Sequence, residues 1–180
     1  MSLKKSPIVI FMVALVTWSI DAGPAYADHA IEPFFGVYEG NALSDRNSGR
    51  VLKLSIQPLK KKGFEIDWST TTFISGTGKT KSYKVSFVPS GRDQIFSSAM
   101  RRNLFGKLTP MDPLKGDPFV WCKIEGKSLI VYSLLILDDG GYEMQEYVRT
   151  LNGEKLSLSF SRIRNGKPLK LITGEYTRVK

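Results

Sequence analysis

Residues 119–179 read FVWCKIEGKSLIVYSLLILDDGGYEMQEYVRTLNGEKLSLSFSRIRNGKPLKLITGEYTRV, and this stretch decides the fold. Apolar and polar side chains alternate in five short runs, the period-two pattern of β-strands with one buried face. Gly126, the DDGG sequence at 138–141 and the pairs Asn152-Gly153 and Asn165-Gly166 separate the runs. Asn-Gly and Asp-Gly accept the positive φ that both central positions of a tight hairpin require. The stretch therefore predicts five strands joined by four hairpins, an antiparallel meander.

The residues before this stretch continue the pattern, and no long helical period interrupts it. Short alternating runs occur at residues 34–40, 51–57, 64–70, 81–88 and 94–98. An open sheet of this size would leave unpaired edge strands, whereas a barrel closes them. A two-sheet sandwich is the alternative, but its crossings usually need longer connections. The prediction is an all-β fold, an antiparallel up-and-down β-barrel of about eight to ten strands with one long loop at 99–118.

That loop carries Pro110, Pro113 and Pro118 and interrupts the rhythm of strands and hairpins. Loops of this length without regular structure are uncommon and often functional. It is expected either to cross a barrel mouth as a lid, with a helical turn at 101–105, or to pack down on the barrel. Leu104, Phe105 and Leu114 are the apolar side chains for such packing.

The sequence SGTGKT at 75–80 matches the end of a phosphate-binding P-loop. The motif requires a glycine where this chain has Phe73, and a helix should follow it. Instead Tyr83, Val85 and Phe87 alternate with polar residues. The interpretation is a hairpin between two strands, so ATP binding is excluded.

The N-terminus has the three parts of a secretory signal peptide. Lys4 and Lys5 precede an apolar run at 8–20, and Ala25-Tyr26-Ala27 supplies the small-residue cleavage pattern. The run is shorter than the roughly 20 residues of a membrane span. We expect a signal peptide at 1–27, cleavage after Ala27, one β-barrel domain at 28–180, and a periplasmic or secreted protein.

The chain is basic, with 26 Lys and Arg, 17 Asp and Glu, and a net charge of +9. Removing residues 1–27 leaves 24 basic and 16 acidic residues, a charge of +8. A basic exported protein can favour anionic partners such as an envelope surface. Nucleic acid is not expected outside the cytoplasm. The lysine run at 60–62 is interpreted as a solvated hairpin tip.

Few residues suit catalysis or metal binding. The lone histidine, His29, lies near the predicted cleavage point, and the lone cysteine, Cys122, lies in a strand pattern typical of a buried, inert thiol. Neither a Ser-His-Asp triad nor a zinc or calcium motif is present, so no metal and no cofactor are expected. The weak enzyme alternative is a hydrolase or isomerase in which Glu143, Glu146 and Glu175 converge.

The candidate site is a set of aromatic residues and arginines on the strands. Arg162 shares a face with Leu156, Leu158 and Phe160, and Arg149 shares a face with Tyr147 and Gln145. A charge in an apolar row either emerges at the barrel rim or meets an acid or a ligand carboxylate inside. The predicted ligand-binding residues are Tyr38, Trp68, Tyr83, Trp121, Tyr132, Met144, Arg149, Phe160 and Arg162. The same side chains could instead fill a solid barrel.

The strand at 34–40, FFGVYEG, resembles the Gly-x-Trp strand of lipocalins and related calycin barrels, with Tyr38 in place of tryptophan. The resemblance implies that a basic residue at the end of the last strand, Arg178, packs across Tyr38. MDPLKGDPFVW and DDGGYEMQEYVRTL are similar to a group of exported, lipocalin-like bacterial proteins of unassigned function. These similarities imply a fold and a compartment and bring no activity.

Two functions from different classes follow. The first is a barrel that binds a small apolar or amphipathic ligand of lipid, isoprenoid or pigment type, with Arg149 or Arg162 on an acidic head group. The second is an envelope interaction protein with a filled barrel, which binds a protein or an anionic surface through its basic exterior and the 99–118 loop. Nothing in the sequence predicts the oligomeric state.

Overall fold

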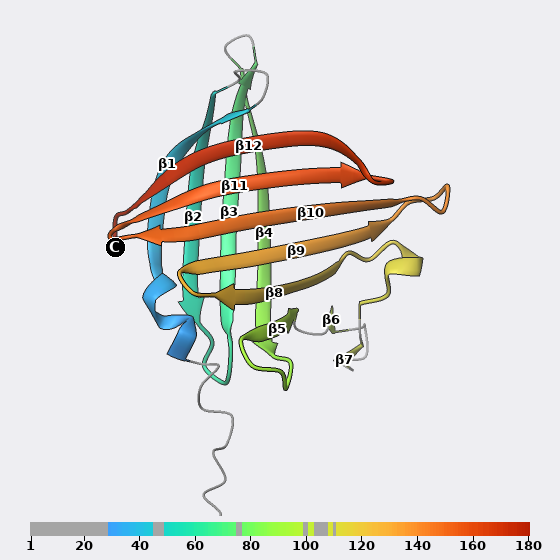
Figure 1. The fold of residues 1–180 in the computed structure, drawn as a ribbon, viewed down its shortest axis with the longest axis horizontal. Helices are drawn as coiled ribbons and strands as arrows, with labels where there is room; N and C mark the ends of the chain where they lie inside the picture. Colours follow the sequence, from blue (N-terminus) through green and yellow to red (C-terminus); the bar gives the residue numbers. More distant parts are fainter. Residues whose placement is uncertain (1–28, 45–48, 75–76, 99–100, 103–107, 110) are drawn as a thin grey trace, which may run out of the picture.

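The fold is a closed antiparallel up-and-down β-barrel of ten strands, as predicted (Figure 1). A computed structural model describes residues 29–44, 49–74, 77–98, 101–102, 108–109 and 111–180. The predicted signal peptide at 1–27 and its cleavage site lie outside these residues. The barrel strands are β1 (Gly36–Ser44), β2 (Gly49–Pro58), β3 (Phe64–Ile74), β4 (Thr77–Pro89), β5 (Ile95–Ser98), β8 (Phe119–Glu125), β9 (Ser128–Ile136), β10 (Tyr142–Asn152), β11 (Lys155–Arg164) and β12 (Lys167–Arg178).

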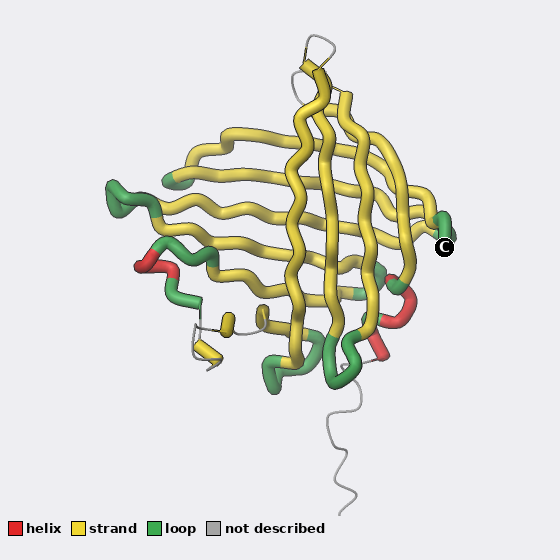
Figure 2. The backbone as a smooth tube through the Cα atoms, turned by 180° about the vertical axis from the view of Figure 1, so that it is seen from behind, coloured by secondary structure: helices red, strands yellow, loops and turns green. Residues whose placement is uncertain are grey.

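Each barrel strand pairs with its neighbours in the chain, and β12 closes the barrel against β1. The strands β1 to β4 run across β8 to β12, and Figure 2 shows the same crossing from behind. The sandwich alternative is therefore wrong: short hairpins keep consecutive strands adjacent and provide no crossovers. None of the helices in the described part of the chain has the length and apolar character needed to cross a bilayer.

The hairpins follow the glycines of the sequence, with one difference from expectation. Asn165 and Gly166 have φ of 48° and 77°, so they fill both central turn positions. At the other Asn-Gly pair, Asn152 is the last residue of β10, and Gly153, with φ of 62°, is the first central residue. This corresponds to a type II′ turn, which needs positive φ at that position alone. β3 and β4 form a hairpin in which Phe73 pairs with Gly78 and Ile74 with Thr77, so residues 77–80 of the SGTGKT segment lie in a strand; residues 75–76 lie outside the described part.

The alternation of side chains places one face of each strand inside the barrel. In β2 the interior residues Arg50, Leu52, Leu54 and Ile56 are buried; of the three residues between them, Val51 and Lys53 are exposed and Ser55 is half-buried. At one end the interior is solidly packed; we call this the closed half. Its centre is Phe64, whose ring centroid lies 5.3 Å from that of Phe87 and 5.0 Å from that of Phe96.

A short 3₁₀ turn, η1 (Glu32–Phe34), covers the closed half and buries Phe34. The Tyr38 hydroxyl donates to the Phe34 carbonyl at 2.9 Å. Arg178 lies over the Tyr38 ring at 5.1 Å and donates to the carbonyls of Phe35 and Pro33, at 2.7 and 2.8 Å. This is the packing that the lipocalin resemblance implies. Gly36, with φ of 150°, starts β1, and a Cβ there would lie 2.9 Å from the Lys180 carbonyl oxygen.

The segment between β5 and β8 matches the predicted loop at 99–118. It contains a two-stranded ladder of β6 (Arg101–Arg102) and β7 (Leu108–Thr109), and the 3₁₀ turn η2 (Pro113–Lys115). The expected helical turn at 101–105 is wrong for Arg101 and Arg102, which pair as a strand; residues 103–107 lie outside the described part. Hydrogen bonding explains the turn at 113–115, because the Asp112 carboxylate accepts from the Leu114 N–H at 3.1 Å.

Candidate functional site

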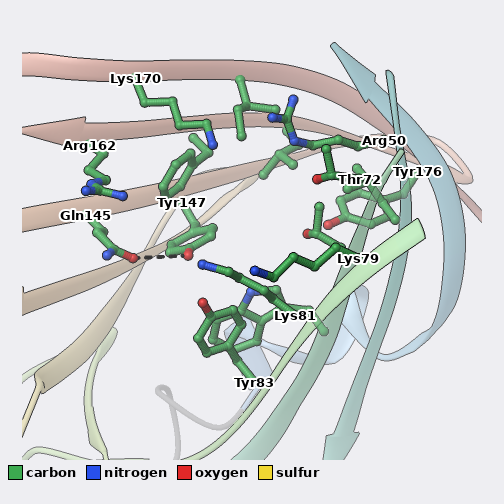
Figure 3. Close-up of a pocket in the computed structure, with 16 residues that line it drawn as sticks. Arg50, Thr72, Lys79, Lys81, Tyr83, Gln145, Tyr147, Arg162, Lys170 and Tyr176 are labelled. Atoms are coloured by element: carbon green, nitrogen blue, oxygen red, sulfur yellow. Dashed lines mark hydrogen bonds between the residues drawn. The ribbon is translucent and has the colours of Figure 1, made fainter. Parts of the chain in front are cut away.

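The other end of the barrel, which we call the open half, contains a cavity of about 330 Å³ (Figure 3). Its walls come from the interior faces of β2, β3, β4, β10, β11 and β12. Ligand pockets span about 300–1,000 Å³, so this volume suits a compact molecule. No described residue of the 99–118 loop lines it. The interior is therefore neither wholly solid nor wholly hollow: the closed half is packed, and the open half has room for a ligand.

In the part of the chain that the structure describes, all the charged side chains that line the cavity are cationic. They are Arg50, Lys79, Lys81, Arg162 and Lys170. Figure 3 shows these side chains around the cavity, from strands on both sides of it. Lys79 and Lys81 are exposed, and Arg50 is buried. Low-dielectric walls concentrate the field of such a set, so the cavity attracts anions.

One buried carboxylate, Glu143, faces inward beside the cavity and binds side chains of the cavity wall. Its side chain forms ion pairs with Arg162 at 3.0 Å and Arg164 at 3.4 Å. The Gln145 amide donates to Glu143 at 2.8 Å, and the Tyr147 hydroxyl donates to Gln145 at 3.2 Å. The chain of contacts fixes the polar ends of Gln145 and Tyr147 in the cavity wall. It also partly neutralises Arg162, whereas no described residue forms an ion pair with Lys79 or Lys81.

Aromatic rings form the floor of the cavity. The Trp68 ring stacks on Tyr83 at 5.3 Å and meets Tyr147 edge-on at 5.5 Å. Tyr147 in turn contacts Phe160 at 4.6 Å. Such pairs form a rigid apolar surface with polar tips. The floor therefore suits the apolar body of a ligand.

Arg149 lies beneath this floor and is the principal anomaly of the interior. Its side chain is 0% exposed, and none of its three guanidinium nitrogens has a hydrogen-bond partner. The guanidinium carbon lies 5.5 Å from the Trp68 ring and 5.3 Å from the Tyr147 ring. Cation–π contacts offset only part of the desolvation of a buried charge. Arg149 therefore adds uncompensated positive charge directly below the cavity.

Burial also changes the acidity of the surrounding groups. It raises the pKa of Tyr147 to about 12, although the nearby Arg149 charge opposes the shift. Burial raises the pKa of Tyr176 too, and Arg149 opposes that shift through its charge and through its proximity to the Tyr176 hydroxyl, although the two groups form no hydrogen bond of good geometry. Burial raises the pKa of the Cys122 thiol as well. These three groups are therefore protonated at neutral pH, and Cys122 has neither the exposure nor the acidity of a reactive thiol.

The strand register sorts the predicted site residues into two sets. Trp68, Tyr83, Phe160 and Arg162 line the cavity, Arg149 lies below it, and Tyr38 faces inward in the closed half. By contrast, Trp121, Tyr132 and Met144 lie on the outer face. Trp121 pairs with Tyr132, while their neighbours Cys122 and Val131 face inward and are 0% exposed. The prediction that these three line a barrel site is corrected: β8 and β9 are apolar on both faces, and on β10 the inward-facing residues are Glu143, Gln145, Tyr147 and Arg149, so Met144 faces outward.

Twelve of the sixteen described residues that line the cavity were not among those predicted, and seven of these have a charged, amide or phenol side chain. The seven are Arg50, Lys79, Lys81, Gln145, Tyr147, Lys170 and Tyr176. A signal for several of them exists in the alternation of side chains. Lys79 and Lys81 share a face with Tyr83, Val85 and Phe87, and Arg50 shares one with Leu52. Continuing the inward-facing alternation to the end of each strand would have identified these cations as interior residues.

The register also separates the three carboxylates proposed for an enzyme site. Glu143 faces inward and is paired with arginines, whereas Glu146 and Glu175 alternate onto the outer face. Glu175 forms an ion pair with Lys155 at 2.7 Å. The predicted convergence of these carboxylates is wrong. In the described part of the chain, no three His, Cys, Asp or Glu residues gather as a metal site, and His29 contacts Glu32 at an exposed position.

Comparisons with known proteins add no functional information. No protein-family model matches the chain, and no curated protein is similar to it. One solved structure with some likeness is an N-terminal dehydratase from the difficidin assembly line, with 7% identity over 84% of this chain and 81% of that chain. The TM-score is 0.26, so this likeness supports neither a shared fold nor a shared activity.

Proposed function

We propose that the barrel binds a small amphipathic anion, with its apolar body on the aromatic floor and its acidic head among the cations of the mouth. The observation that supports this most directly is the composition of the cavity wall. Among the described residues, every charged side chain that lines it is cationic, and Trp68, Tyr147 and Phe160 contact one another in its wall. A carboxylate or phosphate head would supply a counter-charge to Lys79 and Lys81, with which no described residue forms an ion pair.

The proposed ligand is lipid-like rather than a small polar anion. The cavity offers both an apolar floor and a charged entrance, and a ligand that contacts both must be amphipathic. Fatty acids and acidic isoprenoids belong to this class. Arg149 contributes through its charge rather than by contact, because it does not line the cavity, whereas Trp68 and Tyr147, whose rings it contacts, do.

We further propose that the protein is an exported, lipocalin-like carrier. The N-terminal sequence supports export, and the Arg178–Tyr38 packing under a closing 3₁₀ turn supports the family resemblance. We propose binding without catalysis. Among the described residues, the one carboxylate that faces this half of the interior, Glu143, is already paired with Arg162 and Arg164.

The direct test compares two ligands that differ only in the head group. Dodecanoate and dodecanol are titrated into the protein, and Trp68 fluorescence or calorimetry reports binding. We expect dodecanoate to bind at least about tenfold more tightly, a difference of about 1.4 kcal/mol. The double variant K79Q/K81Q should reduce that preference, because it removes two of the mouth charges.

A matched control is K60Q/K61Q, which removes the same net charge from the hairpin at the other end of the barrel. This variant should keep the preference for dodecanoate. Equal affinity for the two ligands, or no binding of either, would contradict the proposal. Native mass spectrometry of protein purified from its own cells then identifies the bound class: a co-purifying lipid-sized mass supports it.

A further inference from the structure

Exposed apolar side chains gather at the open end of the barrel, outside the cavity. Leu43 is 59% exposed, Phe73 53% and Leu171 50%. They lie near the end of β1, near the end of β3 and near the start of β12, which are the strand ends that surround the mouth. Exposed apolar patches on a protein surface mark interaction sites. Ligand binding in the cavity does not explain why these three apolar side chains are exposed.

The register brings these side chains together on the outer face. Leu43, Val51 and Phe73 line one shallow groove around Gly49, which has no side chain to fill it. Leu43 pairs with Thr173 on β12, so Leu171 is its diagonal neighbour on the same face. We call the set Leu43, Val51, Phe73 and Leu171 the rim patch. Arg50 is the one described residue that lines both the groove and the cavity, and no residue of the rim patch lines the cavity.

Cations without a counter-charge lie at the same end. On the barrel body, Lys53, Lys84, Lys123 and Lys155 each have a carboxylate oxygen within 3.3 Å. No described residue forms an ion pair with Lys79 or Lys81, at the start of β4. The open end thus combines exposed apolar side chains with unpaired lysines, which is the combination that binds an anionic lipid surface.

We propose that the open end of the barrel docks on an anionic lipid bilayer, with the rim patch inserted among the head groups and Lys79 and Lys81 facing the lipid phosphates. The charge of the site selects this partner, because a bilayer surface supplies both negative charge and an apolar boundary. Docking in this orientation places the cavity mouth against the membrane. A ligand could then pass between bilayer and cavity without crossing water, and that last step rests on the proposed function.

The test measures binding to phosphatidylcholine vesicles with and without phosphatidylglycerol by co-sedimentation. All variants are purified from the same cells, so that residues 1–27 are in the same state in each. We expect binding to the anionic vesicles that weakens with added salt. L43S/F73S should reduce binding at least about tenfold, since both apolar side chains leave the interface. The matched control V179S changes an apolar residue that is 57% exposed at the other end, and it should bind normally.

A second pair separates docking from general attraction. K79Q/K81Q should weaken vesicle binding more than K60Q/K61Q, although both remove two positive charges. Equal effects of the two pairs, or unchanged binding by L43S/F73S, would overturn the proposal. So would vesicle-independent dimerisation that L43S/F73S abolishes, because a second copy would then be the partner.

Titration with dodecanoate tests ligand binding in the cavity independently of membrane docking. The side chains changed in L43S/F73S lie outside the cavity, so this variant should bind dodecanoate like the unmodified protein while losing the vesicles. Loss of dodecanoate binding by the unmodified protein would contradict the carrier function and leave docking standing. Circular dichroism and thermal unfolding confirm that each variant is folded.

Discussion

The two halves of the barrel use the same strands for opposite purposes. In the closed half, Phe64, Phe87 and Phe96 are each 0% exposed and pack face to face and edge to face. In the open half, the same strands β3 and β4 present Thr70, Thr72, Lys79 and Lys81 to a cavity. The change occurs at the level of Trp68 and Arg149. A barrel of this size can therefore be stabilised at one end and left open for a ligand at the other.

The largest expected effect comes from equal truncations in the two halves. F64A removes a ring from a fully packed cluster and should lower the free energy of unfolding by about 3–5 kcal/mol. F160A removes a ring that is 8% exposed and borders the cavity, so fewer packed contacts are lost. We expect its loss to be less than half that of F64A. Urea denaturation measures both, and equal losses would contradict the division into a packed and a hollow half.

Arg149 and Arg162 give a second comparison, because their replacement should change the free energy of unfolding in opposite directions. Replacing a buried, uncompensated charge by an apolar side chain of similar volume is often stabilising, by about 1–4 kcal/mol. R149M should therefore raise the unfolding free energy, by roughly 1–2 kcal/mol, because Arg149 has no hydrogen-bond partner. R162M should lower it by about 1 kcal/mol, since Glu143 loses one of its two arginine partners at a partly exposed site.

Ligand-binding measurements on R149M show whether the charge of Arg149 contributes to ligand binding. If the charge of Arg149 serves an anionic ligand, R149M should bind dodecanoate more weakly than the unmodified protein and bind dodecanol equally well. A more stable protein with unchanged dodecanoate affinity would show that Arg149 is not part of the binding mechanism. A less stable R149M would show that the cation–π contacts to Trp68 and Tyr147 outweigh desolvation.

The difference between the halves also explains what could be predicted from the sequence. Turn residues and alternation are local signals, so the five-strand meander and the closing strand with Arg178 were predictable. Alternation identifies the inner face where the other face is polar, as in β11, where Phe160 and Arg162 alternate with serines. It fails in β9, whose sequence SLIVYSLLI is apolar on both faces, and Tyr132 was misplaced for this reason.

The position of a residue along the barrel axis is harder to predict. Lys79 and Lys81 reach the mouth because β4 begins at Thr77, and Lys170 lines the same cavity because it pairs with Arg162 in the regular register of β11 and β12. Barrel closure and strand stagger are properties of all strands together. No short window of sequence contains them, so the cationic mouth was visible only as scattered charges.

The smallest expected effect concerns pH and the boundary between the halves. Burial raises the pKa of Tyr147 to about 12 from an ordinary value of about 10. Between these values the folded protein keeps a proton that the unfolded chain has lost. The stability contributed by the neutral phenol is therefore complete below pH 10 and declines as pH rises toward 12. At about pH 11 this decline amounts to roughly 1 kcal/mol.

Y147F removes the titrating hydroxyl and keeps the ring that contacts Trp68 and Phe160. We expect the unmodified protein to lose more stability than Y147F between about pH 8 and pH 11, measured by urea denaturation at each pH. At pH 8 the variant should be close to the unmodified protein, apart from the hydrogen bond to Gln145. Parallel pH dependences would show that water reaches the Tyr147 hydroxyl, which would move the boundary of the packed region below the ring and enlarge the space available to a ligand.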